Sequence, residues 1–223
     1  KIKTAVSGCL TKKLLLAAHF LVFYIFAGVL CAFLLKKGAG FSNRPGKNAF
    51  NPWYFILWAA LTVFSAYRSI GDHVGGSDID SYLVFFCNVE RVFSVYWDTF
   101  KMHDPLQFCL FRASKLISPD FRVLLLICYG FMSFVYIAFA DAYGKDKDSF
   151  LPYIVIAVIV YKSFASLRTG LAIAFVLLGL TVFKKHKLAG FVIALISLGL
   201  HFYTAVFAMA FFVFWVICRN AYK

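Results

Sequence analysis

Acidic residues are scarce in this sequence, and familiar metal and nucleotide motifs are missing from it. Only 10 Asp and Glu stand against 23 Lys and Arg, which gives a net charge of +13. Such an excess can indicate nucleic-acid binding, but the basic residues gather in short clusters beside apolar runs, where membrane topology explains them. No CxxC, HExxH or nucleotide-binding motif is present, and Cys and His do not cluster. We therefore expect no nucleic-acid partner, no metal and no cofactor.

Paired cysteines are missing as well. Only Cys87 and Cys109 fall in one segment that we expect to face an oxidising compartment, and their spacing alone does not bring them together. The pattern favours unpaired cysteines that serve as small apolar residues. The six cysteines are scattered singly, at Cys9, Cys31, Cys87, Cys109, Cys128 and Cys218.

Apolar residues, in contrast, are abundant. Hydrophobic residues make up 62% of the chain and aromatic residues 20%, whereas a soluble domain is about 45–50% apolar. This composition predicts an all-α, polytopic transmembrane helix bundle, one transmembrane domain over residues 1–223 with no soluble domain. The sequence does not begin with Met and shows no signal-peptide pattern, so we expect a fragment or a processed product.

The apolar runs divide into spans by length, because a helix needs about 20 apolar residues to cross the hydrocarbon core. Residues 150–183 would measure about 51 Å as one helix, so we expect a break within 162–170, where Ser, Arg and Gly gather. The same argument divides residues 188–218 at His201. The predicted spans are 14–35, 50–67, 121–140, 150–166, 169–183, 188–200 and 202–218, with an outer segment over 68–120.

The outer segment mixes acidic and basic residues and predicts two helices. Ser77 and Asp80 resemble a capping box, and the apolar residues that follow recur at alternating steps of three and four, as in an amphipathic helix at a membrane interface. Asp104 and Pro105 are typical of the N-cap and first position of a second, short helix. The apolar face of the first helix is Ile79, Tyr82, Phe86, Val89, Phe93, Tyr96 and Phe100.

The distribution of Lys and Arg sets the expected orientation. Loops 36–48, 141–149 and KKHK at 184–187 lie at one set of helix ends, together with the C-terminal RNAYK. By the positive-inside rule we place these loops in the cytoplasm. The N-terminal arm, with four lysines, falls on the other side and opposes this assignment.

With this orientation, five polar side chains gather at the outer face. An arginine at mid-helix costs about 2.5–3.5 kcal/mol, so Arg168 must sit at a membrane surface or a wet cavity, which makes it a site candidate. Guanidinium binds phosphate through paired N–H groups, and His201 or Asp78 is of the type that accepts a proton near neutral pH. Purely structural roles stay open for three of them. Arg168 would extend its charge to the membrane surface, His201 would be a hydrogen-bonded packing residue, and Asp78 would stabilise a helix N-terminus through the helix dipole. The five are Arg68, Asp78, Asp104, Arg168 and His201.

Three pieces of the sequence, taken in order, resemble the EpsG family of Wzy-like bacterial O-antigen and exopolysaccharide polymerases. Such proteins show an Arg before a Gly-x-Asp-x-x-x-Tyr loop, an Arg-x-Gly-Leu-Ala helix start and a His-Ser/Thr region that opens the next span. Here Thr204 supplies the hydroxyl instead of a serine next to the histidine, and the chain stops after one further span, where such polymerases usually continue. The pieces are AYRSIGDHVGGSDIDSYLVFF (66–86), LRTGLAIAF (167–175) and LHFYTAVF (200–207).

The resemblance implies a membrane glycosyltransferase that joins oligosaccharide repeat units carried on undecaprenyl pyrophosphate, at the outer face of the bacterial inner membrane. Its partners would be the lipid-linked oligosaccharide and membrane lipid, and the resemblance leaves room for a chain-length regulator. A lipid-linked donor agrees with the missing nucleotide motif. The roles implied are catalysis by His201, Asp78 and Arg168, and substrate binding by Arg68, Tyr82, Asp104, Gly170 and Thr204.

Two other classes of function stay open. Asp78 and Asp80 are also typical of polyprenyl-sugar glycosyltransferases that add single sugars, some of which hold a divalent metal on an acidic pair; metal dependence would separate this class from a polymerase. A transporter or flippase of lipid-linked sugars would also need outer arginines and a wet cavity. Such a protein tends to show inverted repeats, and we detect no internal repeat.

Overall fold

The computed structural model describes residues 29–31, 33–37, 51–67, 78–91, 104–143 and 166–221. Within these residues all regular secondary structure is helical, which confirms the all-α prediction. The longer helices of this part are α2 (Pro52–Ala66), α3 (Ile79–Cys87), α5 (Pro105–Ile117), α6 (Phe121–Tyr143), α8 (Leu167–Phe183), α9 (Lys187–Leu200) and α10 (Phe202–Ala221).

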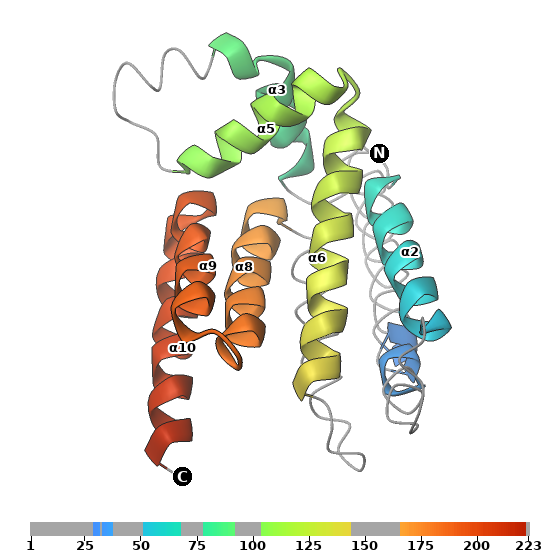
Figure 1. The fold of residues 1–223 in the computed structure, drawn as a ribbon. Coiled ribbons are helices and arrows are strands. Elements are labelled where there is room, and N and C mark those ends of the chain that lie inside the picture. Colours follow the sequence, from blue (N-terminus) through green and yellow to red (C-terminus); the bar gives the residue numbers. More distant parts are fainter. Residues whose placement is uncertain are drawn as a thin grey trace, which may run out of the picture.

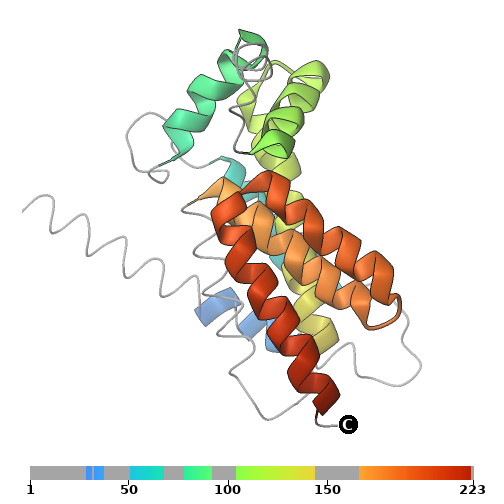
Figure 2. The same cartoon turned by 90° about the vertical axis from the view of Figure 1, so that its left-hand side faces the viewer.

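Helices α3 and α5 lie across one end of a bundle of longer helices (Figures 1 and 2). Within the bundle, α8 packs against α6, α9 and α10, and α2 packs against α6. Helix α5 contacts both α9 and α6, and α3 contacts α5. We call the end of the bundle beneath α3 and α5 the covered end. The turn between α8 and α9 lies at the opposite end (Figure 1).

Local sequence signals set several helix boundaries. Asn51 accepts two backbone N–H groups of the first turn of α2, and Pro52 follows it at a position where no N–H is needed. Asp104 and Pro105 begin α5, and Ser118 ends it with an extended backbone. The start of α5 is as predicted, and α2 lies within the predicted span 50–67.

The predicted break at His201 is confirmed, and a helix begins within the region 162–170 where the other break was predicted. Helix α8 begins after Ser166 and α10 after His201, and both of these residues have an extended backbone. The basic turn at 184–186 separates α8 from α9. Span 14–35 is described only near its end, where residues 29–31 and 33–35 are helical. Residues 150–165, which make up nearly all of another predicted span, lie outside the described residues.

The amphipathic helix predicted from residue 79 to residue 100 is interrupted at Asn88. Helix α3 ends at Cys87 with Asn88 as its C-cap, residues 89–91 are helical again, and residues 92–100 lie outside the described residues. The interruption has a physical cause, because Lys115 Nζ from α5 donates to the carbonyl oxygens of Phe86 and Cys87 at 3.2 and 2.7 Å. These oxygens therefore have a partner outside the helix.

Ser77, the first residue of the predicted capping box, lies outside the described residues. Asp78 precedes α3, and its side chain makes no capping hydrogen bond. The apolar face of this helix is as predicted where it is described, since Ile79, Tyr82, Phe86 and Val89 are all buried. Burial of this face stabilises the helix.

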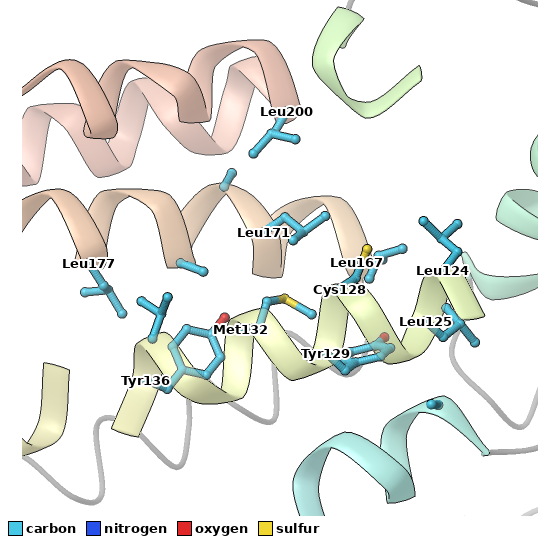
Figure 3. Close-up of a cluster of buried hydrophobic side chains, with 14 of the residues drawn as sticks. Leu124, Leu125, Cys128, Tyr129, Met132, Tyr136, Leu167, Leu171, Leu177 and Leu200 are labelled. Carbon is cyan, nitrogen blue, oxygen red and sulfur yellow. The ribbon is translucent and has the colours of Figure 1, made fainter. Parts of the chain in front are cut away.

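The core lies between α6 and α8, as Figure 3 shows. Large side chains of α6, including Tyr129 and Met132, are fully buried together with Leu167 and Leu171 of α8. The Tyr136 hydroxyl donates to the Gly170 carbonyl oxygen at 3.0 Å, which ties the middle of α6 to the first turn of α8. This contact sets the position of α8 along the axis of the bundle.

Two glycines let α8 and α9 approach with their backbones. A Cβ atom built on Gly179 would lie 2.6 Å from the backbone oxygen of Gly190, and a Cβ atom built on Gly190 would lie 2.6 Å from the backbone oxygen of Gly179. A real Cβ cannot occupy that distance, so both positions require glycine for close packing. The pair holds the hairpin of α8 and α9 as one unit.

Helix α6 is the one described helix that is long and apolar enough to cross a membrane. It continues to Tyr143, beyond the predicted end at residue 140, because the Tyr54 hydroxyl donates to Asp141 Oδ1 at 3.0 Å and the Tyr143 hydroxyl to the Leu180 carbonyl at 2.8 Å. Four further described helices are apolar but shorter: α2, α8, α9 and the first part of α10.

The cysteines that the structure describes carry no disulfide, as predicted. Cys87 and Cys109 are exposed and free, although α3 and α5 are neighbours. Cys31 and Cys128 are buried and free. The small apolar role expected from the sequence holds for the buried pair.

Candidate functional site

Three polar side chains meet at the covered end, each held at the end of a helix. Arg168 lies in the first turn of α8, His201 lies in the break between α9 and α10, and Asp104 is the N-cap residue of α5. Because each helix starts or stops at this level, charged groups reach the cluster without interrupting a hydrogen-bonded helix. The cluster joins residues that are 33 to 97 positions apart in the sequence.

Asp104 lies at the centre of the cluster. Its side chain is only 8% exposed, and its carboxylate makes no capping bond to its own helix. Instead, Oδ2 accepts from Arg168 Nη1 at 3.2 Å, and Oδ1 accepts from the backbone N–H of Phe202 at 3.2 Å. A buried carboxylate needs such partners to offset its lost hydration. Asp104 thus links α5 to the start of α8 and the start of α10.

Arg168 is less buried than its partner, with 37% of its side chain exposed. Besides the bond to Asp104, its Nε donates to the Tyr82 hydroxyl at 3.2 Å, and its Cζ lies 5.6 Å from the centre of the Tyr82 ring. A guanidinium carries five N–H groups, and only these two have acceptors in the described part of the chain. The other N–H groups have no acceptor among the described residues, so they are placed to receive an anion.

Tyr82 of α3 connects Arg168 to Asp78. The ring is buried and packs edge-to-face against Phe111 at 6.1 Å, while the hydroxyl donates to Asp78 Oδ2 at 3.2 Å. Burial raises the pKa of the Tyr82 phenol, so the hydroxyl stays protonated and donates to the carboxylate while it accepts from Arg168. The buried ring acts through its hydroxyl and offers no face on which a sugar could stack.

His201 is close to Asp104 but does not bond to it. Its Nδ1 is 3.8 Å from Asp104 Oδ2, which is longer than a hydrogen bond. Nδ1 is buried and has no hydrogen-bond partner among the described residues. The side chain as a whole is 20% exposed, and its ring meets that of Tyr203 edge-on at 6.5 Å.

Of the eight predicted site residues, five belong to this network: His201, Asp104, Arg168, Tyr82 and Asp78. Gly170 faces the other way, since its carbonyl accepts from α6. Thr204 lies in the first turn of α10 and is half-buried. Arg68 lies outside the described residues. The functional roles assigned to these residues remain predictions.

Two hydroxyl residues belong to the network although sequence reasoning passed over them. Ser166 Oγ is 3.4 Å from the Tyr82 hydroxyl, and Thr169 Oγ1 donates to Ser166 Oγ at 3.2 Å. The available signal was the Ser-x-x-Thr spacing at the start of a helix, where hydroxyl side chains are favoured. Their hydroxyls extend the polar surface beside Arg168.

The site is suited to an anion. Within the described residues, no group of three His, Cys, Asp or Glu side chains is placed to hold a metal ion. A half-exposed guanidinium with free N–H groups, next to an imidazole, can bind a phosphate oxygen and accept a proton nearby.

Comparison of the chain with protein-family models, curated proteins and solved structures gives no match. The functional argument therefore depends on the geometry of the covered end and on the sequence pattern.

Proposed function

We propose that this chain is a membrane glycosyltransferase similar to the EpsG family, which joins oligosaccharide repeat units carried on polyprenyl pyrophosphate. The observation that carries the proposal is the meeting of Arg168, Asp104 and His201 at one end of an apolar helix bundle. Two of these residues come from the sequence pieces that resemble the family, and Asp104 joins them from α5. A charged site at the end of apolar helices is what a substrate with a lipid tail and a charged head requires.

The chemistry assigns a task to each group. The acceptor sugar hydroxyl attacks the anomeric carbon of the donor, a new C–O bond forms, and the bond from that carbon to the pyrophosphate oxygen breaks. The bonding electrons leave with the polyprenyl pyrophosphate, whose negative charge Arg168 stabilises. The hydroxyl proton passes to His201, which acts as the general base.

The proposed arrangement is a bundle of about seven spans in the bacterial inner membrane, with the covered end outside. In the described part, α9 alone, with 14 residues, separates His201 from the basic turn at 184–187 by about 21 Å. Positive residues favour the cytoplasmic side, so the site would face outward. Large exposed apolar residues on α10, such as Phe207 and Phe214, suit contact with acyl chains.

The test is polymerisation by the purified protein in lipid nanodiscs that also hold a polyprenyl-pyrophosphate-linked oligosaccharide. We expect a ladder of longer oligosaccharides and release of polyprenyl pyrophosphate. His201→Gln should abolish the ladder, whereas His186→Gln, in the exposed turn at the opposite end, should leave it unchanged. A protein that only moves the intact substrate between leaflets, or that adds a single sugar from a metal-dependent donor, would contradict the proposal.

A further inference from the structure

One carboxylate oxygen stands between two donors at the covered end, and it satisfies only one of them. Asp104 Oδ2 is 3.2 Å from Arg168 Nη1 and 3.8 Å from His201 Nδ1. The first distance is within the usual range for a charged hydrogen bond, and the second exceeds it by roughly 0.6–1 Å. Nδ1 is buried without a hydrogen-bond partner in the described residues, a condition that folded proteins avoid.

One oxygen of the Asp104 carboxylate is held independently of Arg168. Oδ1 of Asp104 accepts the Phe202 N–H at 3.2 Å, and this bond does not involve Arg168 or the imidazole. The exchange requires the carboxylate to rotate about that anchor, so that Oδ2 leaves Arg168 and approaches His201. Such a rotation needs only a small displacement because both donors lie within 4 Å of the same oxygen.

An anion on Arg168 would drive this rotation. The guanidinium is 37% exposed and has free N–H groups, so two phosphate oxygens can bind it as a fork. The bound anion then supplies the negative charge that Asp104 supplies in its absence. Arg168 holds the carboxylate less strongly as a result, and Nδ1–H of His201 becomes the better donor for Oδ2.

We propose that Asp104 is a positioning residue that exchanges partners, bonding to Arg168 in the empty site and to His201 when an anion of the pyrophosphate class occupies Arg168. The inference rests on the proposed function, because it takes the anion to be the head group of the donor. Its consequence is specific. With Nδ1–H donated to Asp104, the free lone pair lies on Nε2, and His201 becomes a base only once the donor is bound.

The groups that face His201 allow the exchange to be measured at its imidazole ring. Asp104 comes from α5, Arg168 from α8, and the Tyr203 ring from α10, while Asp78 lies beyond Tyr82 on the far side of Arg168. Asp104 is thus the carboxylate within 4 Å of Nδ1 among the described residues. A change of tautomer at His201 therefore reports on Asp104.

The experiment is nitrogen NMR of the whole chain in nanodiscs, with ¹⁵N in the histidine rings, at an alkaline pH where imidazole is neutral. The His201 signals are assigned by their loss in His201→Gln. Titration with inorganic pyrophosphate should raise the ratio of the Nδ1–H to the Nε2–H tautomer of His201 about fivefold or more, the effect of one net hydrogen bond. Phosphorus line broadening, compared with Arg168→Met, shows whether pyrophosphate binds at Arg168.

Two variants give opposite expected results. Arg168→Met removes the competing donor, so His201 should show the Nδ1–H tautomer without ligand and should not respond to pyrophosphate. Asp104→Asn keeps an oxygen for the Phe202 N–H but places an NH₂ group where Oδ2 was. His201 Nδ1 must then accept, and the Nε2–H tautomer should persist with or without pyrophosphate.

The outcomes separate this inference from the proposed function. Pyrophosphate that binds through Arg168 without changing the His201 tautomer would overturn the exchange and leave phosphate binding by the site intact. No binding that depends on Arg168 would overturn the proposed function and the exchange together. Arg168→Lys is used in place of Arg168→Met where the latter fails to fold, because it keeps the charge and loses the planar fork.

Discussion

Arg168→Lys is the substitution that best separates phosphate binding from a boundary role. Lysine keeps the positive charge and the long apolar stem, so it serves equally well at a membrane surface. It loses the planar fork, however, and has one nitrogen where Arg168 uses Nε and Nη1 for two different partners. A lysine at this position cannot bond to Tyr82 and also present a planar pair of N–H groups to two phosphate oxygens.

The expected loss follows from the hydrogen bonds at stake. A hydrogen bond to a charged group is worth about 1.5–3 kcal/mol, and loss of one in the transition state slows turnover by roughly 10- to 150-fold. The fold should be little affected, because the side chain is 37% exposed and exposed charge contributes little to stability. We therefore expect normal insertion with much shorter polymer.

The assay measures polymer ladder length and initial rate, normalised to the amount of membrane-inserted protein. Arg112→Lys is the matched control, since Arg112 is exposed on α5 and pairs with Glu90 at 3.2 Å; a surface pair of this kind is worth about 0–1 kcal/mol. Wild-type ladders from Arg168→Lys would refute the phosphate-binding role, because they would show that a charge at the helix start is all that the position requires.

Three further predictions test orientation, packing and the polar network. A membrane-impermeant maleimide applied from outside should label the exposed cysteines of α3 and α5. The same reagent should not label His186→Cys in a chain without other cysteines, and labelling of both from outside would contradict the proposed topology. Gly179→Ala places a Cβ 2.6 Å from a backbone oxygen of α9 and should destabilise the fold by about 1–3 kcal/mol in thermal unfolding, whereas Gly130→Ala, with its nearest contact at 3.5 Å, should not. Tyr82→Phe keeps the buried ring but removes the oxygen to which Arg168 Nε donates, so turnover should fall about tenfold at unchanged insertion; an unchanged rate would exclude the hydroxyl from the network's function.

The helix boundaries that can be found from the sequence are those set by neighbouring residues. Asn51 with Pro52, and Asp104 with Pro105, each carry a cap and a first-turn residue within two positions. Such signals act locally and need no tertiary contact. The end of α3 has a different origin, because Lys115 satisfies carbonyl oxygens that lie 28 and 29 residues earlier. Periodicity alone predicts that the helix continues.

The same distinction explains what the sequence revealed of the site. Arg168 and His201 stand out because placing an ionisable group beside an apolar run in a membrane costs free energy, and the sequence alone shows that placement. The position of Asp104 as an N-cap was predictable for a local reason, but its contacts were not. They run to residues 64 and 98 positions away and depend on α5 lying across the bundle. Ser166 and Thr169 were overlooked because a hydroxyl at a helix start has an ordinary local explanation.

The electrostatics of the helix ends give a reason for this arrangement. The N-terminus of a helix carries partial positive charge, which disfavours a cation such as Arg168 in the first turn of α8, and α8 has no acidic residue there to offset it. Asp104 supplies the missing negative charge from α5, and it also accepts the first N–H of α10, which is one of the donors that a helix start leaves unsatisfied. Two helix starts therefore depend on one carboxylate. An anion that binds Arg168 supplies the negative charge that the start of α8 needs. The bond from the Phe202 N–H to Oδ1 still serves the start of α10. Asp104 Oδ2 can therefore leave Arg168 while Oδ1 keeps α5 in contact with the bundle.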